Sequence, residues 1–255
     1  MMIKITERCT MGCIHCLNDA KPDGKDMTIE VLIDTLNFLK KNNIGRGLIV
    51  SGGEPTEHRN FKDIMETLIN WCSNNSRYIV SLTITTNGEN IQNNPDQYID
   101  YIKRMKESGT DLTFQVSSDV RYYPRRIQTH KRIFREPGFI LCDDCVESIY
   151  PKGRALDNNI PWSRISSQCF NIRALSKQGF NTLQSIEFFL LSKDKMCTPH
   201  ISIDGSIKLG ESDLCPKCAS IYDEDSVIID KIRKFKCSGC NHINDKLPEE
   251  YKKFL

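Results

Sequence analysis

The first half of the chain alternates short apolar runs with amphipathic stretches whose apolar residues recur at helical spacing. The apolar runs cover residues 2–6, 47–55, 78–88 and 111–119, and the amphipathic stretches cover 28–41, 60–73 and 95–109. Strands that alternate with helices in this way predict a parallel sheet, either open or closed into a barrel. This alternation is the strongest constraint on the fold, because few architectures other than α/β accommodate it.

The ends of the expected helices carry recognisable signals. Thr28 is a favourable N-cap, Pro95 suits the first turn of a helix, and Gly109 is a typical stop. Cys72 falls on the apolar stripe of its stretch, so we expect it to pack in the core.

Every apolar run in this half ends in polar or glycine-rich residues, which read TERC, SGGEP, TTNG and SSD in chain order. The carboxyl ends of parallel strands meet at one edge of a sheet, and ligands bind there in α/β folds. We therefore expect ligand chemistry at this edge.

The pattern is weaker beyond about residue 135. Residues 138–144 and 185–191 are predicted to be strands five and six, with a helix at 163–179 between them. A hairpin is expected at Asp204-Gly205, where the turn dipeptide separates two short apolar runs. A short helix is expected at 226–235, and the last segment is predicted to be a surface helix or a tail.

Twelve cysteines are an unusual number for this chain, and no signal peptide supports a set of disulfides. We therefore expect a cytoplasmic protein whose clustered cysteines bind metal. The 35 basic and 33 acidic residues give a formal net charge of +2, which argues against a protein that coats nucleic acid or is drawn to a membrane surface. No apolar run approaches the length of a membrane span.

Cys9, Cys13 and Cys16 lie within eight residues, in the stretch CTMGCIHC, and no fourth cysteine is near. A closed structural zinc site requires four protein ligands. Three thiolates are instead typical of a metal site that keeps one position open. A zinc half-site completed by a distant residue is the alternative.

CTMGCIHC, followed after the second expected strand by GGEP at 52–55, resembles the radical S-adenosylmethionine (SAM) enzymes. Their CxxxCxxC motif follows the first strand of a partial (β/α)6 barrel. The resemblance implies that Cys9, Cys13 and Cys16 hold three irons of a [4Fe–4S] cluster and that SAM binds the fourth. It further implies that an electron from the cluster cleaves SAM to a 5′-deoxyadenosyl radical.

The same resemblance assigns residues to SAM. It implies that the GGEP loop binds the methionine amine through Glu54 and backbone groups, and that His15 lies beside the adenine. The full set of implied cofactor contacts is His15, Gly52, Gly53, Glu54, Pro55, Thr86, Asn87, Ser117, Ser118, Asp119 and Arg154. For the residues at the ends of strands three and four, an ordinary solvated side chain is the alternative. Arg154, in YPKGRA, would bind a substrate carboxylate or a SAM oxygen, or lie in solvent.

A second group of cysteines follows the expected hairpin. CPKC at 215–218 and CSGC at 237–240 have the spacing of a zinc ribbon, whose ligands would be Cys215, Cys218, Cys237 and Cys240. The competing interpretation is an auxiliary [4Fe–4S] cluster like that of the SPASM and twitch extensions of radical SAM enzymes, with Cys197 before the hairpin, Cys215 after it and the pair Cys237 and Cys240 closing the site. We favour the auxiliary cluster. Cys142 and Cys145 would form a further metal site or a redox pair.

These features predict an α/β fold, with a partial (β/α)6 TIM-like barrel over residues 1–192 and a small cysteine-rich extension over 193–255. The predicted activity is that of a radical SAM oxidoreductase or modifying enzyme that acts on a peptide or small-molecule substrate. A flavodoxin- or ferredoxin-type electron donor is the expected partner, and neither a membrane nor nucleic acid is expected. The alternative is a cysteine-rich zinc protein that serves as an adaptor or binds nucleic acid.

Overall fold

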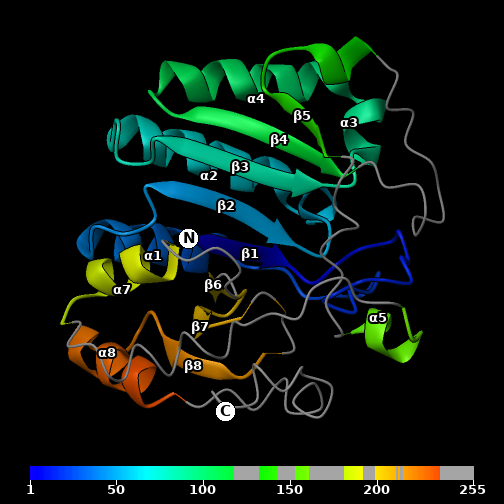
Figure 1. The fold of residues 1–255 in the computed structure, drawn as a ribbon. Coiled ribbons are helices and arrows are strands. Elements are labelled where there is room, and N and C mark those ends of the chain that lie inside the picture. The colour runs from blue at the N-terminus through cyan, green and yellow to red at the C-terminus, as the bar shows by residue number, and fades with distance from the viewer. Residues whose placement is uncertain are drawn as a thin grey trace.

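The structure is a computed structural model and describes residues 1–117, 132–142, 153–160, 181–191, 199–210, 212 and 215–235. Within them, eight strands form one sheet in the order β5-β4-β3-β2-β1-β6-β7-β8 (Figure 1). The strands are β1 (Met2–Thr6), β2 (Gly47–Gly52), β3 (Ser81–Thr86), β4 (Asp111–Ser117), β5 (Phe139–Cys142), β6 (His200–Ile201), β7 (Ser206–Lys208) and β8 (Lys217–Ser220). The α-helices are α1 (Ile29–Lys41), α2 (Phe61–Asn74), α3 (Glu89–Asn93), α4 (Pro95–Glu107), α5 (Arg154–Asp157), α7 (Leu183–Leu191) and α8 (Asp225–Lys234), and the 3-10 helices are η1 (Pro55–Glu57) and η2 (Arg132–Arg135).

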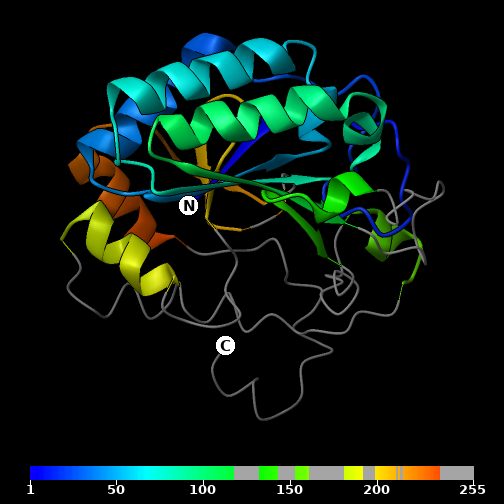
Figure 2. The ribbon, with the colours of Figure 1, turned by 90° about the horizontal axis from the view of Figure 1, so that it is seen from above.

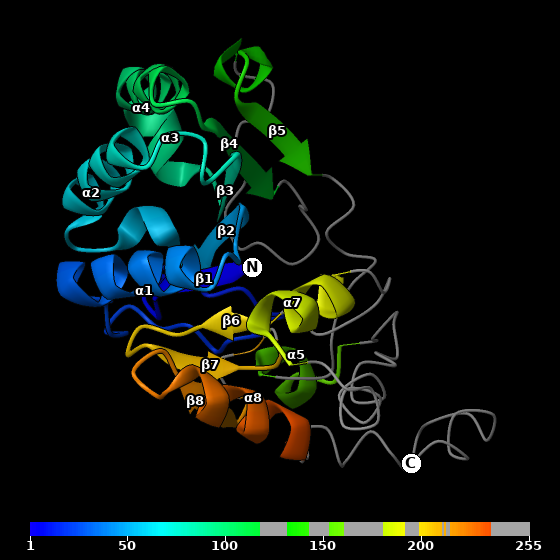
Figure 3. The ribbon, with the colours of Figure 1, turned by 90° about the vertical axis from the view of Figure 1, so that its left-hand side faces the viewer.

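Strands β1 to β6 are parallel, as the alternation of strands and helices predicts, and β7 and β8 are antiparallel to their neighbours. Helices α1, α2 and α4 cover one face of the sheet (Figures 2 and 3). The fold is therefore mixed α/β, with the mostly parallel sheet of a partial TIM-like barrel. This confirms the predicted fold class.

The face of the sheet under these helices is apolar. Ile3, Val50, Ile84, Phe114 and Val116 come from four neighbouring strands, and each is 0 % exposed. They belong to a single core cluster with the buried side chains of α1, α2 and α4. Burial of this face is the main source of stability for such a sheet, because the hydrophobic effect grows with the apolar area removed from water.

The opposite face carries a row of polar side chains across the same strands. Lys4 pairs in register with Ser51, whose hydroxyl accepts a hydrogen bond from Thr85 Oγ1 at 2.9 Å, and Thr85 pairs in register with Gln115. Lys4 is buried, and the other three are half-buried. Successive side chains of a strand point to opposite faces, so this row lies on the side away from the helices.

The predicted helix signals are confirmed. The Thr28 hydroxyl accepts a hydrogen bond from Val31 N at 3.3 Å, and Pro95 is the first residue of α4. Gly109 follows α4 with a φ of 87°, which glycine adopts without steric cost. Cys72 is 1 % exposed and packs in the core from α2, as expected. The short helix α3 was not anticipated.

Residues 185–191 form the last turns of helix α7, so the prediction of a sixth strand there was wrong. Thr182 Oγ1 accepts a hydrogen bond from Ser185 N at 3.1 Å, and Ser185 Oγ donates to Thr182 O at 2.8 Å. This reciprocal pair caps the start of the helix. Leu183 and Ile186, three residues apart, are both buried. A continuous apolar run fits a buried strand and a buried helix equally well, and the cap was overlooked.

The hairpin predicted at Asp204-Gly205 is present, with β6 and β7 paired antiparallel. Gly205 has a φ of 76°, as a tight turn of this kind requires. Strand β6 also pairs in parallel with β1. One sheet therefore contains strands from both sides of the boundary predicted between residues 192 and 193. The helix predicted at 163–179 and the C-terminal segment 247–255 lie outside the described residues.

The C-terminal elements are fastened to α1 by polar contacts. Tyr222 OH donates to Asp34 Oδ2 at 3.1 Å, and Lys41 Nζ lies 3.0 Å from Asp225 Oδ2 at the start of α8. Helix α8 agrees with the helix predicted at 226–235. None of the helices in the described parts of the chain combines the length and the apolar character that a bilayer crossing requires.

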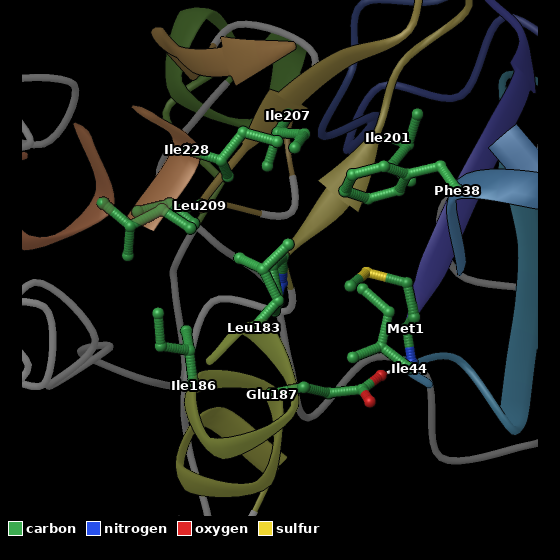
Figure 4. A pocket seen from close by; sticks show the side chains of 12 residues that line it. Met1, Phe38, Ile44, Leu183, Ile186, Glu187, Ile201, Ile207, Leu209 and Ile228 are labelled. Carbon is green, nitrogen blue, oxygen red and sulfur yellow. Dashed lines mark ion pairs between the residues drawn. The ribbon is translucent and has the colours of Figure 1, made fainter. Parts of the chain in front are cut away.

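Helix α7 packs over the hairpin and α8, around a small apolar cavity (Figure 4). The cavity is lined mainly by Leu183, Ile186, Ile201, Ile207, Leu209 and Ile228. At its edge, the Glu187 carboxylate accepts a hydrogen bond from Gly45 N at 2.9 Å. Apolar burial on one side and this polar contact on the other fix α7 against the sheet.

Replacing Ile186 with alanine should lower the free energy of unfolding by about 2–5 kcal/mol, because a buried branched side chain is lost at a site already adjoining a cavity. The exposed Gln184 on the same helix provides the matched control, and Gln184→Ala should change stability by less than about 0.5 kcal/mol. Denaturant unfolding of both variants measures the difference. Equal effects at the two positions would contradict the packing of α7 described here.

Candidate functional site

The loops that follow β1, β2 and β3 meet at one edge of the sheet, where the carboxyl ends of these strands lie side by side (Figure 1). The loop after β1 carries Cys9, Cys13 and Cys16 and is called here the cysteine loop. The loop after β2 carries the GGEP stretch, and Asn87 directly follows β3. Ligand binding was predicted at this edge from the sequence, and the fold brings these loops together there.

The GGEP loop lies directly against the end of β1. Gly53 N donates to Thr6 O and Glu54 N donates to Arg8 O, both at 2.7 Å. A Cβ atom on Gly52 would lie 2.2 Å from Thr6 O, and one on Gly53 would lie 2.2 Å from Arg8 O. Gly52 also has a φ of 147°. Glycine is therefore required at both positions, because any side chain would push the two loops apart.

The cysteine loop is held by its neighbours as well as by the sheet. Thr10 donates to Glu57 twice, from its amide to Oε2 at 2.8 Å and from its hydroxyl to Oε1 at 2.9 Å. Cys9 N donates to Lys21 O at 3.0 Å. The start of the loop is thus joined both to the residues after GGEP and to the returning chain.

Glu54 joins the GGEP loop to the end of β3. Its Oε1 accepts from Thr56 N at 3.1 Å and from the hydroxyls of Thr56 and Thr86 at 2.7 Å each, and its Oε2 accepts from Asn87 N at 2.6 Å. The side chain is buried, and burial raises the pKa of Glu54 while these hydrogen bonds oppose the rise. Protein donors therefore surround the carboxylate, and its predicted contact with an amine stays a prediction.

Asn87 carries a buried donor at the end of β3. It is 6 % exposed, and its Oδ1 accepts from Glu89 N at 2.9 Å. Its Nδ2 has no hydrogen-bond partner among the described residues. An unsatisfied buried donor costs about 1–3 kcal/mol, so Nδ2 is a candidate donor to a bound ligand.

The three thiols of the cysteine loop lie within electrostatic reach of one another. Burial raises the pKa of Cys9 and of Cys13 to about 12, and Cys16 adds to both shifts. No described cysteine is in a disulfide, and no three His, Cys, Asp or Glu side chains of the described residues gather closely enough to hold a metal ion. Since thiolates are the ligating form, metal binding here must release protons.

Three further predicted residues lie at or beside these loops. His15 is half-buried within the cysteine loop, and Pro55 is the buried first residue of η1. Arg154, at the start of α5, donates its backbone amide to Cys16 O at 3.0 Å. The fold thus brings Arg154, distant in sequence, into contact with the cysteine loop.

The remaining predicted residues are placed only in part. Ser117 ends β4 and pairs in register with Cys142 at the end of β5, and both β2 and β3 separate β4 from β1, which leads into the cysteine loop. Cys215 is buried, and Cys218 is half-buried on β8, where burial raises its pKa to about 12. The residues that lie outside the described parts are Ser118, Asp119, Cys145, Cys197, Cys237 and Cys240. Their predicted roles stay predictions.

A polar chain of Lys4, Asn18 and Gly52, next to the GGEP loop, was not predicted from the sequence. Lys4 Nζ donates to Asn18 Oδ1 at 2.7 Å, and Asn18 Nδ2 donates to Gly52 O at 3.1 Å. Lys4 is 1 % exposed. The available signal was a lysine in the middle of the apolar strand MIKIT, since a buried lysine is rare without a specific partner.

Comparison with characterised proteins finds GTP 3′,8-cyclases. A probable GTP 3′,8-cyclase of Methanocella arvoryzae is 27 % identical over 112 residues, which cover 44 % of this chain and 31 % of that protein. The GTP 3′,8-cyclase of Tolumonas auensis is 26 % identical over 103 residues, which cover 39 % of this chain and 29 % of that protein. The matches thus span less than a third of these relatives.

Among solved structures, Streptococcus suis SuiB bound to the precursor peptide SuiA is similar over 93 % of this chain and 69 % of that chain. The TM-score is 0.46 and the sequence identity 14 %. SuiB bound to S-adenosylmethionine gives a TM-score of 0.38 at 14 % identity, over 92 % of this chain and 67 % of that chain.

The family model described as the Radical SAM superfamily matches residues 3–137, which are more than half of the chain. The matched range contains the cysteine loop, the GGEP loop and Asn87, whose contacts form the site described above. The chain therefore belongs to the radical SAM superfamily.

Proposed function

We propose that this protein is a radical SAM enzyme that holds a [4Fe–4S] cluster through Cys9, Cys13 and Cys16 and oxidises or forms a bond in a peptide or small-molecule substrate. When bound, the cluster and SAM supply one-electron cleavage of the sulfonium and the hydrogen abstraction that follows. The observation that carries the proposal is the direct contact between the cysteine loop and the GGEP loop at the end of a parallel sheet.

The residue types at this edge suit the two cofactors. The loop offers three thiols, so a four-iron cluster would keep one iron for another ligand. Gly52 and Gly53 let the GGEP loop lie directly against the residues that lead into the cysteine loop, so the two loops are held side by side. Asn87 Nδ2 supplies a buried donor for a ligand oxygen.

The protein's own contribution is to bind SAM in a fixed orientation. Glu54 accepts from Asn87 N, and Glu89 N donates to Asn87 Oδ1, so both ends of Asn87 are held before any ligand arrives. A donor fixed in this way loses little entropy on binding, which favours affinity. Glu54 thereby acts on the ligand through Asn87, in addition to its proposed contact with the SAM amine.

The polar row Lys4, Ser51, Thr85 and Gln115 supports a polar substrate, because it lies on the sheet face away from the core and next to the same loops. The GTP of the partly similar cyclases is not assigned to this chain, since the match spans less than a third of those proteins.

The remaining parts of the proposal rest on the sequence. The barrel would comprise residues 1–192 and the extension 193–255, where Cys197, Cys215, Cys237 and Cys240 would hold an auxiliary [4Fe–4S] cluster, with zinc as the alternative metal. A flavodoxin- or ferredoxin-type protein would supply electrons in the cytoplasm. Membership in the radical SAM superfamily favours an enzyme over a zinc adaptor or a nucleic-acid-binding protein.

Replacing Cys13 with alanine should abolish SAM cleavage, because the cluster loses one of its three protein ligands. The measurement is 5′-deoxyadenosine released after anaerobic reduction of the reconstituted protein. Cys72→Ala is the matched control: Cys72 packs in the core, so this variant should keep its iron and its cleavage. Cleavage that survives in the Cys13 variant would refute the assignment of the cluster.

Asn87→Asp should weaken SAM binding about tenfold or more, because it removes the unpaired Nδ2 donor and keeps the Oδ1 that accepts from Glu89 N. Equilibrium dialysis of SAM against the anaerobic holoprotein measures the change. Asn93→Asp adds the same charge at an exposed position nearby and should leave the affinity as it is. An unchanged affinity in the Asn87 variant would show that Nδ2 does not contact SAM.

Cys237→Ala should lower the iron content per chain and leave some SAM cleavage uncoupled from product formation, if the C-terminal cysteines hold an auxiliary cluster. Metal analysis together with the cleavage assay provides the test. Loss of zinc at an unchanged iron content would favour the zinc ribbon instead.

A further inference from the structure

Three backbone carbonyls of the cysteine loop and its next residue accept hydrogen bonds from residues that are far away in the sequence. The pairs are Ile14 O with Asn158 Nδ2 at 3.0 Å, Cys16 O with Arg154 N at 3.0 Å, and Leu17 O with Ser212 Oγ at 2.9 Å. The far side of the loop, away from GGEP, is therefore held by the segment around α5 and by Ser212.

The segment around α5, residues 153–160, packs directly against the backbone of the cysteine loop. Gly153 has a φ of 55°, and a Cβ atom there would lie 2.5 Å from Cys16 O and 2.7 Å from Leu17 O. Such distances exclude any side chain at this position. The backbone of Arg154 therefore lies beside Cys16, the last cysteine of the loop, and this position does not depend on the Arg154 side chain.

The Arg154 side chain forms a charge pair next to the cysteines. Its Nε lies 3.8 Å from Asp19 Oδ1, and both side chains are only partly exposed. No hydrogen-bond partner for this Nε occurs among the described residues. The backbone contact of Arg154 with Cys16 places this charge pair beside the cysteine loop. Asp19 also has an exposed partner, Lys21, at 3.2 Å.

We infer that Arg154 is a positioning residue of the cysteine loop: its amide holds Cys16, and its guanidinium, balanced by Asp19, sets the charge beside this loop. The inference rests on the proposed function, since its effect is exerted on the cluster. Reduction of a cluster adds one negative charge, and a nearby positive charge stabilises the reduced form. Arg154 therefore makes the cluster easier to reduce, and Asp19 partly cancels this effect.

The experiment compares the reduction potential of the N-terminal cluster in two variants of opposite charge change. Arg154→Met removes the positive charge, and Asp19→Asn removes the negative charge; both keep the amide of residue 154, and asparagine tolerates the φ of 52° at position 19. Redox titration followed by electron paramagnetic resonance gives the reduced fraction. The signal of this cluster is identified by its change on addition of SAM and by its absence in Cys13→Ala.

At a fixed potential, Arg154→Met should lower the ratio of reduced to oxidised cluster roughly fivefold, and Asp19→Asn should raise it by a similar or smaller factor, because both charges are partly screened by solvent. Arg154→Lys should lie close to the unmodified protein. Shifts of both variants in the same direction, or no shift in either, would overturn the inference, because a purely structural ion pair predicts no opposite effects.

Two controls keep the result decisive. Amide hydrogen exchange of residues 13–18 in the metal-free variants should match that of the unmodified protein, since the backbone contact to Cys16 O remains. If Arg154→Met does not retain iron, Asp19→Asn decides alone: an increase in the reduced fraction supports the inference and an unchanged fraction overturns it. SAM cleavage, measured in parallel, tests the proposed function separately, because the titration requires only the cluster.

Discussion

The close backbone contact between the end of β1 and the glycine pair after β2 is the constraint on which the site depends. Two hydrogen bonds of 2.7 Å join the strands beyond their regular ladder, and neither Gly52 nor Gly53 has room for a Cβ atom. Because the cysteine loop begins directly after this contact, its position relative to GGEP is fixed by the backbone. Side-chain contacts from Thr10 to Glu57 then hold the loop in that place.

The acidic groups near this contact, the Glu54 carboxylate and the cysteine thiols, are either hydrogen-bonded by the protein or have a raised pKa. The Glu54 carboxylate is surrounded by donors of the protein, and burial raises the pKa of the Cys9 and Cys13 thiols further above neutrality. In the metal-free protein the loop therefore carries little net negative charge from these two thiols, which avoids thiolate repulsion in a partly buried place. A metal cluster supplies the compensating charge when the thiols lose their protons.

Much of the first half of the fold was predictable, because local signals and the global arrangement agree there. Thr28, Pro95 and Gly109 mark helix ends as their chemistry suggests, and the apolar runs at 2–6, 47–55 and 111–119 contain strands. The run at 185–191 was misread because its apolar residues are continuous and give no period. The cap formed by Thr182 and Ser185 was the only local sign of a helix.

The residue types of the site were predictable from the sequence, but the hydrogen bonds and contacts between its residues were not. Cys9, Cys13 and Cys16 stand out by spacing alone, whereas the roles of Glu54 and Arg154 depend on contacts across long stretches of chain. Glu54 was expected to contact an amine, and the structure shows hydrogen bonds to Thr86 and Asn87 on the next strand. The contact of Arg154 with Cys16 joins residues separated by most of the barrel, so no local pattern indicates it.

The C-terminal part of the chain contributes to the same edge of the sheet. Strand β6 continues the sheet from β1, and Ser212, which follows the hairpin, donates to Leu17 O next to the last cysteine of the loop. Cys215 N in turn donates to Ser212 O at 2.9 Å, so Cys215 is only two hydrogen bonds away from Leu17. The two cysteine-bearing regions are therefore physically joined. Ser212 thus contacts Leu17 through its hydroxyl and Cys215 through its backbone carbonyl, which couples the position of Cys215 to that of the cysteine loop.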